Sequence, residues 1–169
     1  MITKITCFDF DGTLIHTPTP ELGRPEWEKA TGQSWSGRGW WGNAESLNLK
    51  VFYPPVNQWV HNKYLKEISN DENYVFVATG RLSKLERHVQ KILNLHDIDV
   101  DLFCNTGGET FKFKCYLFEK IIKDNPSAKE FHLYDDRHEH LELFKKWARF
   151  QKISVIITDV INKTTDTIN

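Results

Sequence analysis

Two pairs of aspartates give this sequence its clearest chemical signal. Asp9 and Asp11 follow a short apolar run and lie two positions apart, so in an extended chain their carboxylates point to the same side. Asp135 and Asp136 follow another apolar run much later in the chain. Carboxylates packed together disfavour one another's ionised forms unless a cation compensates, and such an oxygen-rich set suits Mg²⁺. We therefore expect all four aspartates to contribute to a magnesium site.

Cationic and hydroxyl side chains follow other apolar runs and are suited to binding phosphate. Thr79, Gly80 and Arg81 come after one run, and Arg137 comes directly after the second aspartate pair. Two lysines at the start of a later predicted helix could supply further positive charge: Lys112 and Lys114. A phosphate group fits between such cations, and the hydroxyl group of Thr79 can donate a hydrogen bond to it.

Each of these short patterns also has a simpler structural explanation. An Asp-x-Asp-Gly sequence is often only a turn whose side chains bond to backbone amides, and Thr79 or the second aspartate pair could cap the helix that follows. An EF-hand is excluded, because its loop needs glycine at the sixth position and glutamate at the twelfth. Counted from Asp9, Gly12 is fourth and the twelfth residue is Pro20. The joint placement after several predicted strands favours a functional interpretation.

The elements that must position these residues alternate along the chain. Compact apolar runs typical of buried strands lie at 2–8, 74–78, 100–104, 131–134 and 153–157. Apolar residues at helical spacing lie between them, at 56–68, 82–93, 117–122 and 141–148. This alternation predicts an α/β fold with a doubly wound, mainly parallel, Rossmann-like sheet, in which ligands bind beyond the carboxyl ends of the strands. The polar tail from Asn162 is expected to fray.

Composition narrows the class of protein. The 169 residues, 40% hydrophobic and 27% charged, predict one globular domain over residues 1–169. A formal net charge of −1 argues against a protein that coats duplex nucleic acid by bulk charge. Cys7, Cys104 and Cys115 form no close pair, which favours a reducing, cytoplasmic setting over a disulfide framework or a zinc site. We see neither a secretory signal nor a membrane span, and so expect no membrane partner.

Taken in order, the motifs resemble those of the haloacid dehalogenase (HAD) superfamily. The residues that carry this resemblance are Asp9-Phe10-Asp11-Gly12-Thr13-Leu14, Thr79, a lysine and Asp135-Asp136. More narrowly, the sequence resembles the HAD domain of Swiss Army Knife RNA repair proteins. The residues that carry this second resemblance are Thr17-Pro18-Thr19-Pro20, Gly39-Trp40-Trp41, Thr79-Gly80-Arg81, Thr110 with Phe113-Lys114, and Tyr134-Asp135-Asp136-Arg137 with His140.

The superfamily resemblance implies a magnesium-dependent phosphohydrolase. It implies that Asp9 attacks phosphorus and becomes an aspartyl-phosphate, while Asp11 acts as general acid and then general base. Thr79 and the lysine would hold the transferring oxygens, and the Thr-x-x-Phe-Lys pattern favours Lys114 over Lys112. The implied magnesium ligands are Asp9, the backbone carbonyl of Asp11, and Asp135 or Asp136.

A tryptophan-rich insertion follows the first predicted strand, at about residues 15–55. HAD proteins commonly select substrates with a cap, so the resemblance predicts a small cap or flap here. Trp40 and Trp41 could stack on a nucleobase. They would then bind substrate together with residues beside the phosphate, namely Gly80, Arg81 and Arg137. The equally open alternative is that the rings form a miniature core within the insertion.

Two classes of function remain open from the sequence. The first is a phosphomonoesterase acting on phosphate ends of RNA or DNA, with nucleotides or small metabolites as alternative substrates. The second is a phosphate- or nucleic-acid-binding module without catalysis. The intact Asp9 and Asp11 pair favours the enzyme, because binding alone needs no nucleophile and a carboxylate repels phosphate. The sequence determines neither the substrate nor the oligomeric state.

Overall fold

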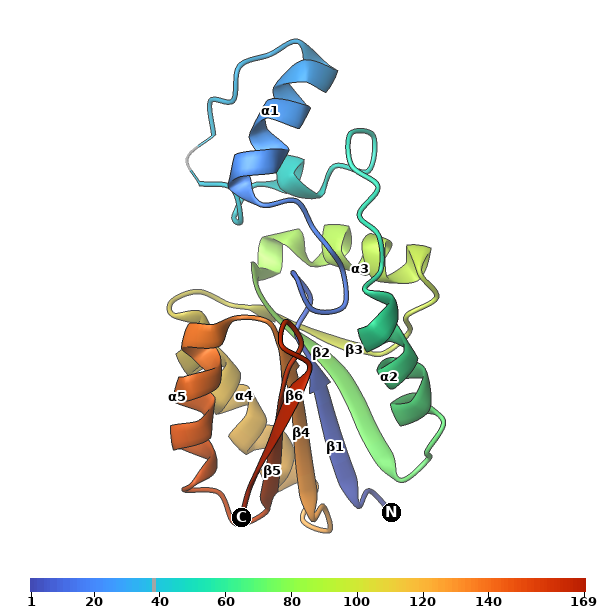
Figure 1. Cartoon of the computed structure of the whole chain (residues 1–169), viewed down its shortest axis with the longest axis vertical. Coiled ribbons are helices and arrows are strands. Elements are labelled where there is room, and N and C mark those ends of the chain that lie inside the picture. Colours follow the sequence, from blue (N-terminus) through green and yellow to red (C-terminus); the bar gives the residue numbers. More distant parts are fainter. Residues whose placement is uncertain (38) are drawn as a thin grey trace.

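Six strands form one sheet in the order β3-β2-β1-β4-β5-β6, in a computed structural model that describes residues 1–37 and 39–169 (Figure 1). The strands are β1 (Lys4–Phe8), β2 (Asn73–Leu82), β3 (Asp101–Asn105), β4 (Glu130–Asp135), β5 (Ser154–Asp159) and β6 (Thr164–Ile168). Strands β1 to β5 are parallel to their neighbours, and β6 alone pairs antiparallel, with β5. The predicted doubly wound, mainly parallel sheet is confirmed.

Helices cover both faces of this sheet. One face carries α2 (Gln58–Ile68) and α3 (Glu86–Leu95), the latter preceded by the short helix η2 (Ser83–Leu85). The other face carries α4 (Thr110–Asp124) and α5 (His138–Ala148). None of the helices in the described part of the chain is long and apolar enough to cross a bilayer.

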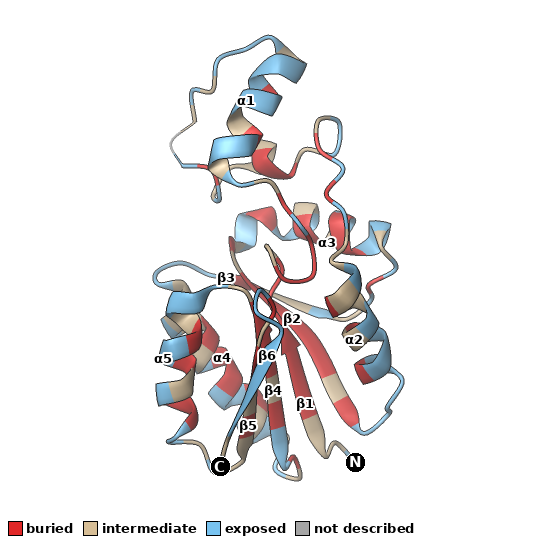
Figure 2. Cartoon of the chain, in the orientation of Figure 1, coloured by how far each residue is buried: buried red, intermediate tan, exposed pale blue. Residues whose placement is uncertain are grey.

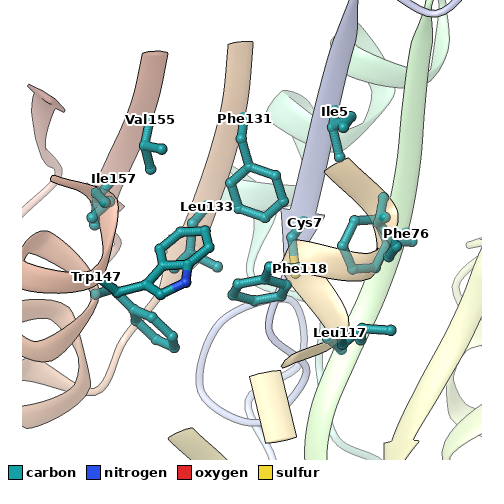
Figure 3. Packing of buried hydrophobic residues seen from close by; sticks show 14 of the residues in the cluster. Ile5, Cys7, Phe76, Leu117, Phe118, Phe131, Leu133, Trp147, Val155 and Ile157 are labelled. Carbon is teal, nitrogen blue, oxygen red and sulfur yellow. The ribbon is translucent and has the colours of Figure 1, made fainter. Parts of the chain in front are cut away.

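The core follows from alternation along the strands, which turn successive side chains to opposite faces. In β2, Phe76 and Ala78 pack toward α4 and α5, while Val75 and Val77 pack toward α2 and α3. Figure 3 shows the α4 and α5 side, where Phe118 lies close to Phe131 with ring centroids 4.9 Å apart. Buried residues therefore run along the central strands (Figure 2) and belong to clusters on both faces of the sheet.

The carboxyl-terminal tail departs from expectation. Residues from Asn162 were predicted to fray, yet Thr164–Ile168 forms β6 and pairs with β5 along its length. Most of its side chains are exposed, so the strand carries no apolar pattern that the sequence could reveal. The backbone hydrogen bonds to β5 hold it instead.

The insertion contains more regular structure than its composition suggests. Helix α1 (Pro20–Thr31) begins with proline in its first turn and ends at Gly32, whose left-handed backbone places its N–H on the Glu28 carbonyl. The short helix η1 (Ala44–Leu47) follows. Figure 1 shows both elements beyond the carboxyl ends of the strands, over α3. Arg38, within this predicted insertion, lies outside the described residues.

Candidate active site

Three neighbouring strands bring the predicted motif residues to one edge of the sheet. Asp9 directly follows β1, Thr79 lies in β2, and Asp135 ends β4, and β1 lies between the other two. The Asp9 N–H donates to the Tyr134 carbonyl at 2.9 Å, which continues the β1 and β4 ladder to Asp9. The parallel pairing of the backbone therefore fixes the relative positions of these residues without any side-chain contact.

Lys114 is the cation at the centre of this edge. It lies in α4 and is only 1% exposed. Its Nζ atom donates to Asp9 Oδ1 and to Asp135 Oδ2, each at 2.7 Å. Burial alone would lower the pKa of Lys114, but the carboxylates of Asp135 and Asp9 outweigh it and hold that pKa well above its usual range. Lys112 instead is largely exposed and pairs with Glu109, so only Lys114 reaches the site.

Three carboxylates gather around this lysine. Asp9, Asp135 and Asp136 each offer an oxygen within 4.8 Å of the others. Burial, with added repulsion from the other two carboxylates and opposition from Lys114, raises the pKa of Asp9 to about 8. Burial and the adjacent Asp135 raise the pKa of Asp136 to about 6. The site thus holds more negative charge than one ammonium group neutralises.

This donor set fits a hard divalent cation. Three ionised carboxylates would exceed the single ammonium group by two charges, and burial together with the neighbouring carboxylates raises the pKa of Asp9 and of Asp136, so a further cation would favour their ionised forms. All-oxygen coordination at one open edge of a sheet suits Mg²⁺. The carboxylate of Asp11 lies outside this cluster. A contribution from the Asp11 backbone carbonyl stays a prediction.

Gly12 makes room for the Asp136 carboxylate. Its φ of +73° lies in the left-handed region, and a Cβ atom at this position would lie 2.1 Å from Asp136 Oδ2. The adjacent Thr13 donates its hydroxyl to Asp136 Oδ1 at 3.4 Å. The turn after β1 therefore holds the Asp9 carboxylate and also leaves room for the carboxylate of Asp136, which follows β4. Only glycine satisfies both requirements here.

Asp11 is held away from the carboxylate cluster by two donors. Thr17 donates its hydroxyl to Asp11 Oδ1 at 2.6 Å. Arg81 donates from Nε to Oδ2 at 2.9 Å and from its terminal nitrogen to Oδ1 at 2.8 Å, a bidentate ion pair. Thr17 belongs to the insertion and Arg81 to β2, so elements far apart in sequence fix one orientation of this carboxyl group.

Arg81 also joins the insertion to the sheet. The side chain is 1% exposed, and another of its nitrogens donates to the Ser46 hydroxyl at 2.6 Å and to the Trp41 carbonyl at 2.9 Å. Its guanidinium carbon lies 4.8 Å from the centre of the Trp41 ring. The sequence suggested a substrate-binding arginine. The structure shows a side chain already held by protein groups, and a contact with substrate stays a prediction.

A pocket of about 200 Å³ opens over these groups. Its lining residues are Asp9, Asp11, Trp41, Gly80, Arg81, Thr110, Lys114, Asp135, Arg137 and His140. Thr79 does not line it: the residue is fully buried, and its hydroxyl accepts from the Arg81 N–H at 3.1 Å. Burial and the Arg137 guanidinium lower the pKa of His140, so this ring is neutral at neutral pH at the pocket rim. Thr110 and His140 also line the pocket, and the sequence marks them only through the family resemblance.

Trp40 is a correction to the expected substrate-binding set. Its ring is 1% exposed and packs against Trp27 and Phe52, and its Nε1 donates to the Pro18 carbonyl at 2.8 Å. A ring enclosed in this way cannot stack on a base, so Trp40 belongs to the miniature core of the insertion. Trp41 points the other way, is 39% exposed and lines the pocket.

Comparison with known proteins settles the family. Residues 28–167 match the family described as HAD domain family 1 in Swiss Army Knife RNA repair proteins. The chain belongs to this family. Membership of this family supports HAD-type phosphohydrolase chemistry in general. HAD proteins generally use Mg²⁺, and the chain has a cluster of three aspartates that could hold it. The match begins after Asp9 and Asp11, so the assignment of that pair depends on the geometry described above.

One curated relative of this HAD domain is the uncharacterized protein YMR265C of Saccharomyces cerevisiae. The two are 24% identical over 170 residues, which cover 86% of this chain and 37% of the yeast protein. The HAD domain thus spans little more than a third of the length of that relative. No solved structure matches the chain.

The replacement Gly12→Ala tests the packing of Asp136. We expect the new methyl group to displace the carboxylate and to weaken activation by Mg²⁺ by about 10- to 100-fold, as loss of a supporting contact does in other metal sites. The matched control is Gly32→Ala, which has the same left-handed strain but no atom within 4 Å of the added carbon. Titration of activity with Mg²⁺ should separate the two variants. Equal weakening of Mg²⁺ activation in both variants would show that backbone strain, and not displacement of the Asp136 carboxylate, causes the loss.

Separate alanine variants of Trp40 and Trp41 test their opposite roles. Trp40→Ala should destabilise the insertion by about 3 kcal/mol, because it empties the centre of a small core. Trp41→Ala should change the free energy of unfolding by less than about 1 kcal/mol, yet lower turnover at the pocket. Thermal unfolding measures the stability of each variant, and phosphate release measures its turnover. A stable Trp40 variant with reduced turnover would reverse this assignment.

Proposed function

We propose that this HAD domain is a magnesium-dependent phosphomonoesterase that works through an aspartyl-phosphate on Asp9. One observation carries the proposal: a nucleophilic carboxylate, a second carboxylate and a buried lysine open onto a single pocket, namely Asp9, Asp11 and Lys114. A phosphate-binding module needs the lysine but neither carboxylate, because a carboxylate repels a phosphate group. The non-catalytic alternative is therefore disfavoured.

The proposed reaction proceeds in two displacements at phosphorus. One Asp9 oxygen attacks, forms the acyl phosphate and releases the substrate alkoxide, which takes a proton from Asp11. Asp11 then accepts a proton from water as the water attacks the phosphorus atom, which releases phosphate and regenerates Asp9. Arg81 and Thr17 hold the Asp11 carboxylate, the form that accepts the proton from water, in one orientation. Lys114 contacts Asp9 directly and orients the attacking carboxylate.

Asp9, Asp135 and Asp136 are the side chains that would hold Mg²⁺. When bound, Mg²⁺ supplies positive charge that offsets the negative charge of the phosphoryl group and of the carboxylate cluster. Thr79 and Lys114 are proposed to hold the phosphoryl oxygens, as the superfamily resemblance implies. Thr79 is fully buried and its hydroxyl accepts from the Arg81 N–H, so its contact with the phosphoryl group stays a prediction.

The proposed substrate is a phosphate at the end of RNA or DNA. At about 200 Å³, the pocket is smaller than the 300–1,000 Å³ typical of small-molecule sites, so it accepts a phosphate group and leaves the bulk of a substrate outside. The exposed Trp41 ring at the rim can stack on a terminal base, and Arg137 adds positive charge there. The family description, which names RNA repair proteins, supports the same substrate class.

A phosphate-release screen tests the substrate class. It compares oligonucleotides with terminal phosphates, mononucleotides, sugar phosphates and p-nitrophenyl phosphate, each with and without Mg²⁺. We expect the highest kcat/KM for the phosphorylated ends, by about one to two powers of ten over p-nitrophenyl phosphate. Equal efficiency on all classes would contradict the nucleic-acid substrate but leave the phosphatase assignment intact. No release from any of them would contradict the phosphatase assignment too.

A further inference from the structure

Residues 41–50 of the insertion help to line three hollows. Trp41 lines the active-site pocket, and 42–44 line the next hollow, of about 410 Å³. The third hollow, of about 380 Å³, is lined by residues between Ala44 and Lys50. Ala44 and His88 line both the second and the third hollow, so these two adjoin. We call the second and third hollows the α3 groove, because η2 and α3 form their opposite wall.

The α3 groove is lined by cations. Lys84, His88 and Lys91 lie on one stripe of its helical wall, since they are four and three residues apart. Lys50 comes from the insertion on the opposite side. Among the described residues, none forms a salt bridge with any of the three lysines. The buried His88 Nδ1 also has no hydrogen-bond partner there.

One carboxylate shares the groove, and it is already bound. Glu45 accepts from Trp27 Nε1 at 2.7 Å and from the Asn48 side-chain amide at 2.8 Å. The whole chain carries a net charge of −1, so the positive charge of the groove is local. On α5, by contrast, Lys145 is neutralised by Glu142 at 2.8 Å and Asp166 at 2.9 Å. Three lysines against one carboxylate leave the α3 groove positively charged, which favours a polyanion.

The dimensions and position of the groove favour a single nucleic-acid strand. From Lys84 to Lys91 the helical wall rises about 10 Å, a length that a few consecutive nucleotides of a single strand can follow. Trp41 lines the active-site pocket and the next residue, Gly42, lines the α3 groove, so the groove begins one residue along the chain from the pocket. We propose that the α3 groove binds the backbone phosphates of a single-stranded oligonucleotide whose terminal phosphate lies in the active-site pocket. This inference rests on the proposed function and names the surface that the strand follows.

Binding of an oligonucleotide without a terminal phosphate tests the groove apart from catalysis. The probe is a fluorescent single strand of about ten nucleotides, followed by anisotropy over a series of salt concentrations. In the test variant, glutamine replaces all three groove lysines: Lys50→Gln, Lys84→Gln and Lys91→Gln. In the matched control, glutamine replaces three exposed lysines on and after α4, on the opposite face of the sheet: Lys120→Gln, Lys123→Gln and Lys129→Gln.

The groove variant should bind about 10- to 100-fold more weakly than wild type at low salt. The slope of log Kd against log salt concentration should be smaller by about two for this variant. Each lost contact between a lysine and a single strand removes about 0.7 from that slope. The control variant should lose much less affinity. Equal losses in both variants, or no binding by wild type, would overturn the proposal. Binding of heparin but not of the oligonucleotide would also overturn it, by showing a different polyanion.

Turnover of p-nitrophenyl phosphate, measured in parallel, keeps the two proposals distinguishable. Because this substrate occupies only the pocket, groove-dependent binding with no turnover by wild type would contradict the proposed function and leave the groove intact. Turnover by wild type with unchanged binding by the groove variant would contradict the groove alone. Thermal unfolding of both lysine variants confirms that each retains the fold.

Discussion

The variant Asp9→Asn should lose turnover by about four to six powers of ten while keeping its fold. The amide has the size of the carboxylate, but its nitrogen and oxygen are poor nucleophiles, so neither displacement at phosphorus begins. Burial and the neighbouring carboxylates already disfavour a charge at Asp9, so a neutral group is tolerated. Lys114 keeps its second partner, Asp135. We therefore expect a melting temperature within about 4 °C of wild type, or about 1 kcal/mol.

Asp71→Asn is the matched control for this variant. Asp71 is exposed between α2 and β2, so the same change removes a carboxylate remote from the site. Phosphate release and thermal unfolding of both variants give the comparison. Turnover near wild type in Asp9→Asn would remove Asp9 from the proposed reaction. A large loss of stability would instead make the lost turnover a consequence of unfolding.

Removal of metal should lower turnover by at least about 100-fold. Mg²⁺ is expected to offset charge on the phosphoryl group and within the carboxylate cluster, an effect of several kcal/mol, and each 1.36 kcal/mol is a factor of ten in rate. Excess Mg²⁺ should restore activity after chelation. Ca²⁺ should restore it poorly, because Ca²⁺ prefers more ligands at longer distances. Full activity in excess chelator would contradict a role for the cluster.

The affinity for Mg²⁺ should increase as the pH rises from about 6 to 8. In the metal-free protein, protons compete with the cation for Asp136, with a pKa of about 6, and for Asp9, with a pKa of about 8. Raising the pH removes these protons, so binding then releases fewer of them and becomes tighter. Calorimetric titration at three pH values, in buffers of different protonation enthalpy, measures both the affinity for Mg²⁺ and the number of protons released on binding. An affinity independent of pH across this range would contradict the assignment of these ligands.

The sheet and the position of the site follow from local sequence patterns. The apolar run before Asp9 and the run before Asp135 each predict a strand, and parallel strands end at one edge. The site residues on these strands therefore meet whatever the details of the loops. Lys114 could be preferred over Lys112 only through the family pattern, because both lie at the start of one helix. The structure gives the physical reason, since Lys114 faces the sheet and Lys112 faces solvent.

The parts that could not be predicted depend on long-range contacts. Trp40 and Trp41 are adjacent, and nothing in their composition indicates which ring faces the insertion core and which faces the pocket. Arg81 has the residue type of a phosphate ligand, yet its partners Asp11 and Ser46 lie 70 and 35 residues away. Strand β6 has no apolar face, so only its pairing with β5 identifies it.

The most direct test of the account is a search for phosphate on Asp9 itself. Wild type is mixed in excess with p-nitrophenyl phosphate and Mg²⁺, quenched with acid within a single turnover, and reduced with borohydride, which converts an aspartyl-phosphate to homoserine. Mass spectrometry of the peptides should find homoserine at position 9, and Asp9→Asn should show none. Complete release of phosphate with an unmodified Asp9 at every time point would contradict a covalent intermediate on this residue.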